Sequence, residues 1–167
     1  MKIFLSCLVF LCSITSMAQP GRGSITEKEL KDLAGNWAGT MVYTGDSSQI
    51  TSVVALEVVD MKDSLVFNYT FTHKDGKQVK EKNSLRIYEE GNKLSFDSAQ
   101  FDIVSTRRRG IRLTIIAERV GVENFRSADF QETINMGPGI FNYTKGIRYM
   151  DMSEAYLIRK RVTLTKK

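Results

Sequence analysis

The sequence predicts an all-β domain: an antiparallel up-and-down barrel of about 8–10 strands, preceded by one short capping helix. Three observations support this prediction. From residue 37 to residue 165, alternating apolar and polar side chains are interrupted by turn residues at intervals of about 8–12 positions. The connections are too short for crossover helices, so neighbouring strands should pair antiparallel. Only residues 26–35 carry a helical pattern.

The helical pattern begins with a capping box, because Thr26 stands three positions before Glu29. Leu30 and Leu33 form a narrow apolar stripe, and Gly35 can adopt the left-handed conformation that ends many helices. We therefore expect a helix over residues 27–34. Its stripe is too small to fold alone, so the helix should cover one end of the barrel.

The clearest strand lies at residues 65–72, where apolar side chains occupy every second position. The residues predicted to share inward faces are Leu65, Phe67, Tyr69 and Phe71 on this strand, Ile111, Leu113, Ile115 and Ala117 on a second, and Phe141, Tyr143, Ile147 and Tyr149 on a third. Hairpin turns are expected at residues 74–77, 90–92, 108–110 and 136–139 because these segments contain glycine, with polar residues in the first three and proline in the last.

Residues 1–18 read as a cleaved signal peptide. Lys2 precedes an apolar run, and Ser16-Met17-Ala18 is a small-residue cleavage site. Cleavage after Ala18 would leave a tail at residues 19–26 and a single barrel domain with its helix at residues 27–167. The protein should then be exported, to the periplasm or beyond. Both cysteines, Cys7 and Cys12, lie in the signal, so the mature chain would have none.

The composition leaves little room for catalysis or metal binding. Without mature cysteines, and with His73 as the only histidine, no zinc cluster or thiol nucleophile is expected. We therefore predict no catalytic residues, no metal, no cofactor and no enzymatic activity. The run Arg107-Arg108-Arg109 is read as a solvated hairpin tip, since a formal charge of +5 without a broad basic stripe predicts no nucleic-acid partner.

Gly35-Asn36-Trp37, after a short helix, resembles the G-x-W start of the lipocalin and calycin barrels. Residues 33–40, 66–70 and 157–165 are similar to small secreted lipocalin-like proteins of Gram-negative bacteria. The resemblance implies that Trp37 packs at the closed end beneath a cation from the last strand. Arg159 is the residue that the resemblance selects for this cation, so Gly35, Trp37 and Arg159 would be a structural signature.

The parity of the last strand offers an alternative cation. If Ile158, Val162 and Leu164 face inward, Lys160 faces inward as well, while Arg159 and Arg161 face outward. A β-bulge would shift the phase by one residue and turn Arg159 inward. Which of these three cations covers Trp37 therefore stays open.

The same parity suggests a ligand site. If Tyr149 pairs with Tyr156, Lys145 stands directly opposite Lys160, and like charges in that position need a counter-charge such as Glu132. We hypothesise that these three residues receive an anionic head group. The apolar wall would consist of Phe67, Tyr69, Phe71 and Tyr143.

Two functions follow from this reading. The resemblance implies a carrier of a small hydrophobic molecule, for example a fatty acid, held inside the barrel. The alternative is a barrel filled by its own side chains, which would act as an interaction or envelope-structural module without a ligand. In that case the lysines would reach out to water.

Overall fold

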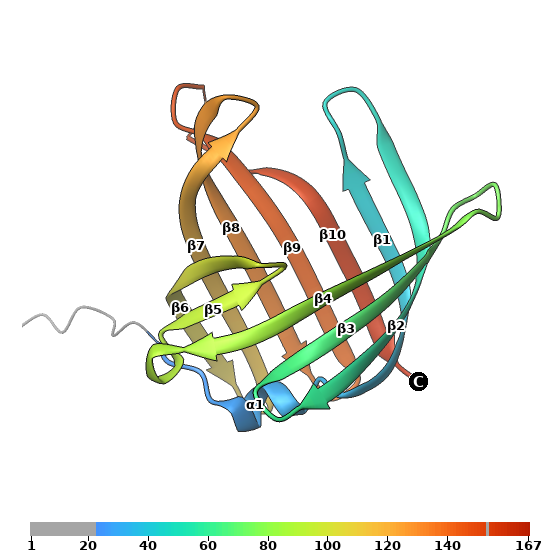
Figure 1. The fold of residues 1–167 in the computed structure, drawn as a ribbon, viewed down its shortest axis with the longest axis vertical. Helices are drawn as coiled ribbons and strands as arrows, with labels where there is room; N and C mark the ends of the chain where they lie inside the picture. The colour runs from blue at the N-terminus through green and yellow to red at the C-terminus, as the bar shows by residue number, and fades with distance from the viewer. Residues whose placement is uncertain (1–22, 153) are drawn as a thin grey trace, which may run out of the picture.

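The computed structural model describes residues 23–152 and 154–167, so the expected signal peptide, residues 1–18, lies outside the described residues. Ten strands form one closed antiparallel barrel, in which chain neighbours pair and β1 pairs with β10 (Figure 1). The predicted up-and-down barrel is thereby confirmed. No helix among the described residues is long and apolar enough to cross a membrane.

The elements follow one another in the order of the barrel wall. They are α1 (Glu27–Lys31), β1 (Gly35–Thr44), β2 (Gln49–Met61), β3 (Ser64–Thr72), β4 (Gln78–Tyr88), the 3-10 helix η1 (Glu89–Gly91), β5 (Lys93–Phe96), β6 (Ala99–Arg109), β7 (Arg112–Glu123), β8 (Arg126–Gly137), β9 (Ile140–Tyr149) and β10 (Leu157–Lys166). Helix α1 lies at one end, here called the closed end, and the β1–β2 and β7–β8 turns lie at the other, the mouth (Figure 1).

The predicted capping box is present, since the Thr26 hydroxyl accepts from the backbone N–H of Glu29 and the Glu29 carboxylate accepts from that of Thr26. The helix is shorter than predicted and ends at Lys31. Gly35 does not terminate it. Instead, Gly35 adopts a φ of 124° and is the first residue of β1. The turn is already complete before it, because the backbone N–H of Leu33 donates to the carbonyl of Leu30 and that of residue 34 donates to the carbonyl of Lys31.

The predicted inward faces are buried, with one exception. Every residue of the set on β3 is buried, as are those on β9 and the members Leu113, Ile115 and Ala117 on β7. Ile111 was wrongly placed in this set and is 78% exposed. It lies in the tight turn between Arg109 and Arg112, where the hairpin has already left the barrel interior and offers nothing to pack against.

Trp37 fills the closed end, as the resemblance implied, with 1% of its surface exposed. Its indole N–H donates to the carbonyl oxygen of Leu33 over 2.8 Å, which ties β1 to the segment after α1. The covering cation is Lys166, whose Nζ lies 5.4 Å from the ring centroid. Gly35 makes room for it, because a Cβ there would meet the Lys166 Cε at 3.0 Å.

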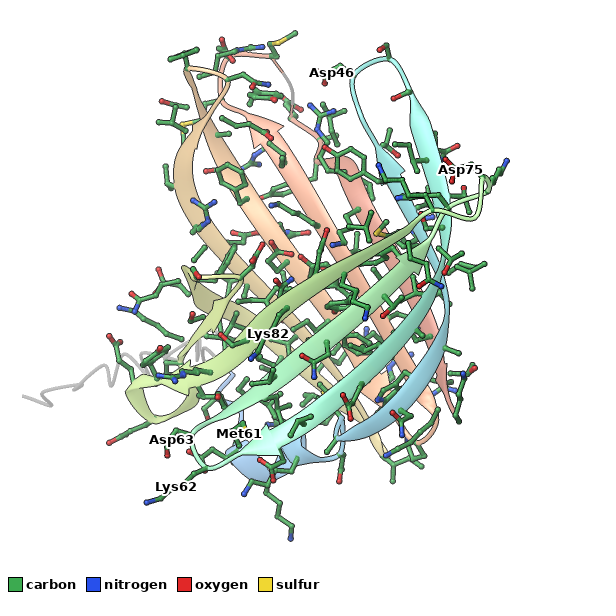
Figure 2. The ribbon with its side chains drawn as sticks, turned by 45° about the vertical axis from the view of Figure 1, so that its right-hand side comes forward. Asp46, Met61, Lys62, Asp63, Asp75 and Lys82 are labelled. Carbon is green, nitrogen blue, oxygen red and sulfur yellow. The ribbon has the colours of Figure 1, made fainter. Side chains whose placement is uncertain are left out.

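The assignment of Arg159 to Trp37 is therefore wrong, and neither Lys160 nor Arg161 covers the ring. The bulge that could have turned Arg159 inward does occur, between Ile158 and Lys160. However, residue 159 is near the mouth. Its guanidinium lies 2.7 Å from the Asp46 carboxylate and donates to the Tyr149 hydroxyl. Figure 2 shows Asp46 at the end of the barrel opposite to Met61, Lys62 and Asp63.

The bulge also explains why the predicted register between β9 and β10 is correct for only one of the two residue pairs. Lys160 stands opposite Lys145, as predicted, but before the bulge Leu157 stands opposite Ile147, so Tyr156 falls one residue short of Tyr149. The prediction was correct on the side of the bulge that contains the lysines.

We predict that Trp37→Ala lowers the free energy of unfolding by about 3–5 kcal/mol, the usual cost of removing a buried aromatic side chain. Urea denaturation followed by far-UV circular dichroism measures it. Tyr43→Ala is the matched control, since Tyr43 lies on the same strand but is 44% exposed near the mouth. Equal losses in the two variants would show that Trp37 has no special role.

Candidate functional site in the barrel interior

The interior changes character from the closed end towards the mouth. The lower half is packed with aromatic side chains. Phe141 contacts both Trp37 and Phe67, with ring centroids about 6 Å apart, and Phe67 meets Phe96 edge-on at 5.7 Å. Higher in the barrel, inward positions on five strands carry charged side chains, which we call the interior charge cluster. Its members are Glu81 on β4, Arg119 on β7, Glu132 on β8, Lys145 on β9 and Lys160 on β10.

The register brings most of this cluster together. Lys145 stands between Glu132 on one neighbouring strand and Lys160 on the other, as the sequence predicted. Arg119 stands opposite Phe130, two positions along β8 from Glu132. Glu81 stands opposite Tyr69, and its carboxylate lies 3.6 Å from the Nζ of Lys160, which closes the cluster across the interior.

Glu132 is the buried centre of the cluster, with 3% of its surface exposed. The Tyr143 hydroxyl donates to its carboxylate, but the Oε2 atom has no hydrogen-bond partner among the described residues. Burial raises the pKa of this carboxyl from 4.5 to about 7, although the Tyr143 hydrogen bond and the charges of Lys145, Arg119 and Lys160 oppose that shift. The Glu132 carboxyl therefore titrates near neutral pH.

The cations rest against aromatic rings rather than against Glu132. The Arg119 guanidinium lies 3.9 Å from the centroid of Phe130, and its buried Nε has no partner among the described residues. Lys160 lies 5.2 Å from the centroid of Phe71, and Lys145 lies 6.0 Å from that of Phe130. These contacts stabilise positive charge in a partly dry interior but leave N–H groups available to a ligand.

The predicted aromatic wall divides into two parts. Phe67 belongs to the packed lower half and cannot line an upper site. Tyr69 and Phe71 stack with centroids 5.4 Å apart and border the charges through Lys160. Tyr143 packs on Phe96 at 5.1 Å and bonds Glu132. Tyr69, Phe71 and Tyr143 therefore border the interior charge cluster, each with 4% of its surface exposed or less.

The wall of the barrel is interrupted beside this cluster. Strand β4 pairs with β5 only from Leu85 to Tyr88, and β7 pairs with β6 only as far as Glu118. Residues 78–84 and 119–123 are consequently two unpaired strand edges on either side of a gap in backbone pairing, here called the opening, above the short β5–β6 hairpin (Figure 1). Glu81 and Arg119 lie on these edges, and the Glu81 side chain is 45% exposed, so water reaches the cluster.

Sequence reasoning missed Arg119 and Glu81. The alternation of Leu113, Ile115 and Ala117 continues to Arg119, so the parity of β7 could have identified it. Glu81 carried a weaker signal, because Val79 and Leu85 share its parity but the positions between are polar, and its inward position depends on pairing with β3.

His73 follows β3 near the mouth, as expected of a strand-end residue. Its Nδ1 lies 2.9 Å from the Oγ of Ser52, a contact that the sequence did not predict. Ser52 is 1% exposed, so this hydroxyl is not placed to attack a substrate. Among the described residues, no group of three or more His, Cys, Asp or Glu side chains could hold a metal ion.

Comparisons with known proteins agree on the fold. No protein-family model matches the chain, and no curated protein matches it by sequence. Among solved structures, the chain is similar to Rv2717c from M. tuberculosis, with 13% identity over 84% of this chain and 96% of that one and a TM-score of 0.62. The closed antiparallel barrel that the resemblance implied is thus shared, as a fold, with this solved structure.

Two crustacyanin structures are more distant. Lobster apocrustacyanin A1 has 11% identity and a TM-score of 0.42, over 82% of this chain and 62% of that one. Apocrustacyanin C2 has 11% identity and a TM-score of 0.44, over 85% and 64%. The match therefore spans less than two thirds of either crustacyanin.

We predict that Glu132 makes the protein less stable as pH rises from about 5 to about 8. The pKa of Glu132 is higher in the folded state than in the unfolded state, so the folded state binds the proton more tightly. The stabilisation that this proton provides is lost as the pH rises through about 7. The change should be about 2–3 kcal/mol. Urea unfolding of the wild type and of Glu132→Gln at both pH values measures it.

The Glu132→Gln variant should lack that part of the pH dependence. Glu57→Gln is the control, because Glu57 is exposed on the outside of β2 and its loss leaves the interior unchanged. A wild type and a Glu132→Gln variant with the same pH profile would contradict the prediction.

Proposed function

We propose that the upper half of the barrel binds a small apolar molecule with an acidic head group, such as a fatty acid. The observation that carries this proposal is the imbalance of the interior charge cluster. Three cations, Arg119, Lys145 and Lys160, face two carboxylates, Glu81 and Glu132. When Glu132 holds a proton, the excess of positive charge grows to two. Removing uncompensated charge from water is costly, so an anion in this position would be stabilised.

The head group would lie among Lys145, Lys160 and Arg119, where their N–H groups are not used by close carboxylates apart from Glu81. A protonated Glu132 could add an O–H donor from its unpartnered Oε2. The apolar part would rest on Tyr69 and Phe71. The opening between β4 and β7 supports a lateral entrance, because neither strand edge is occupied there by a neighbouring strand.

The alternative of a fully packed module accounts for the buried aromatic side chains but not for the interior charge cluster. The lower half is indeed filled by Trp37, Phe67 and Phe141, which limits any ligand to the upper half. A packed module gives no reason for an inward carboxylate with an unpartnered buried oxygen. We therefore favour a binding role over both a structural module and an enzyme.

We predict that Lys145→Met with Lys160→Met weakens binding of a fluorescent fatty acid more than tenfold, since a charge-assisted hydrogen bond contributes about 1.5–3 kcal/mol. The matching fluorescent fatty alcohol, which lacks the anion, should bind both proteins equally. Fluorescence titration measures both ligands. Lys74→Met with Lys77→Met removes the same charge at the β3–β4 hairpin and should have no effect. Unchanged fatty-acid affinity in the interior variant would refute the head-group site.

We further predict that an alkyl sulfonate, which stays ionised throughout, binds more tightly at about pH 6 than at about pH 8. Glu132 is mostly protonated at the lower pH and no longer competes with the ligand for the cations. Calorimetric titration at the two pH values tests this. Glu132→Gln should bind tightly at both, and a pH dependence that survives this substitution would assign the effect to another group.

A further inference from the structure

We propose that the closed end of the barrel docks on a membrane surface rich in anionic phospholipid, through the tip of the β6–β7 hairpin. This tip consists of Arg107, Arg109, Ile111 and Arg112 and is called the arginine tip. It lies beside α1, at the end of the barrel away from the mouth (Figure 1). The proposal does not depend on a ligand in the barrel interior.

Charge at the arginine tip is uncompensated. Arg109 stands directly opposite Arg112 in the hairpin register, and like charges in this position repel. All three arginines of the tip are exposed, and none has a hydrogen-bond or ion-pair partner among the described residues. A partner with several negative charges would relieve that repulsion. Guanidinium groups bind phosphate in bidentate fashion, which favours a phosphate-bearing partner.

The remaining arginine of the hairpin, Arg108, anchors it to the helix instead. Arg108 donates from its Nε to a Glu29 carboxylate oxygen over 2.6 Å and from its Nη2 to the carbonyl oxygen of Ser24 over 2.8 Å. This pairing lowers the pKa of Glu29 to about 2. The hairpin is thereby held against α1, and the other three arginines are presented together on a fixed support.

An apolar side chain stands among these charges. Ile111 is 78% exposed at the turn, and a groove of about 540 Å³ runs beside it. Leu33, Leu113 and Met136 line this groove but are nearly buried, and its charged lining includes Lys166 as well as Glu29 and Asp32. Contact with a nucleic acid or with free phosphate would not bury the apolar surface of an isoleucine, whereas insertion at the acyl boundary of a membrane would. The combination of arginines with an exposed isoleucine therefore favours lipid over the other polyanions.

Docking in this direction has a geometric consequence. The arginine tip and the mouth lie at opposite ends of the barrel, so a protein bound by its closed end keeps its mouth turned away from the membrane (Figure 1).

Sedimentation with lipid vesicles tests the proposal. The protein should bind vesicles of one part phosphatidylglycerol to three parts phosphatidylcholine, and should not bind vesicles of phosphatidylcholine alone. The double variant Arg109→Gln with Arg112→Gln should weaken binding about 25-fold, because each basic residue near an anionic surface contributes about a fivefold gain in affinity. Ile111→Ser should weaken it about tenfold through lost apolar insertion. Each variant keeps the same N-terminal segment, so differences report on the tip.

The matched control is Lys74→Gln with Lys77→Gln, which removes the same charge from the β3–β4 hairpin. It should change binding by no more than about twofold at about 0.15 M salt, because distant charges are screened. Equal losses in the two double variants would overturn the proposal in favour of non-specific attraction. An unchanged affinity of Ile111→Ser, or equal binding to neutral vesicles, would overturn it as well. Thermal unfolding of each variant checks that the exposed substitutions leave the fold intact.

Discussion

The antiparallel pairing of β1 with β10 closes the barrel, and the rest of the structure depends on that seam. Gly39 permits it, because a Cβ at this position would lie 2.0 Å from the carbonyl oxygen of Thr163 on β10. The same seam places Lys166 opposite Trp37, so the last strand supplies the cation that covers the buried indole. Closure also leaves a single interior that side chains must fill from the bottom upward.

Filling the lower half determines where charge can lie. The packed rings around Trp37 exclude water from the closed end, so inward charges are tolerated only above them, where the wall opens between β4 and β7. Two bulges contribute to this arrangement. One in β6 lies between Ile103 and Ser105, just where its pairing with β7 nears its upper limit. The other, in β10, lies between Ile158 and Lys160, and Arg159 within it pairs with Asp46 near the mouth.

The molecule therefore separates its roles along the barrel axis. The closed end provides stability and presents the arginine tip on the outside. The upper interior provides an unbalanced set of charges with a buried carboxyl whose pKa is near neutrality. Since an intervening layer of packed aromatic side chains separates the two, changes at one end should be nearly additive with changes at the other.

Local patterns in the sequence were sufficient for much of this. The alternation on β3 and β9, the capping box at Thr26, and the opposition of Lys145 and Lys160 beside Glu132 all follow from side-chain parity along single strands and hairpins. Two predictions failed for different reasons. Ile111 lies in a turn, beyond the alternation of its strand. Arg159, which the family resemblance selected, lies near the mouth, at the opposite end of the barrel from Trp37.

Side-chain patterns along the chain were thus enough to predict the barrel, its approximate strand number and three of the five members of the interior charge cluster. Three features depend on the folded barrel: the cation that covers Trp37, the approach of Glu81 to Lys160 from across the interior, and the position of the gap in strand pairing. The physical reason is that parity is a local property of one strand. The meeting of distant strands depends on closure, bulges and unequal strand lengths, which no single segment encodes.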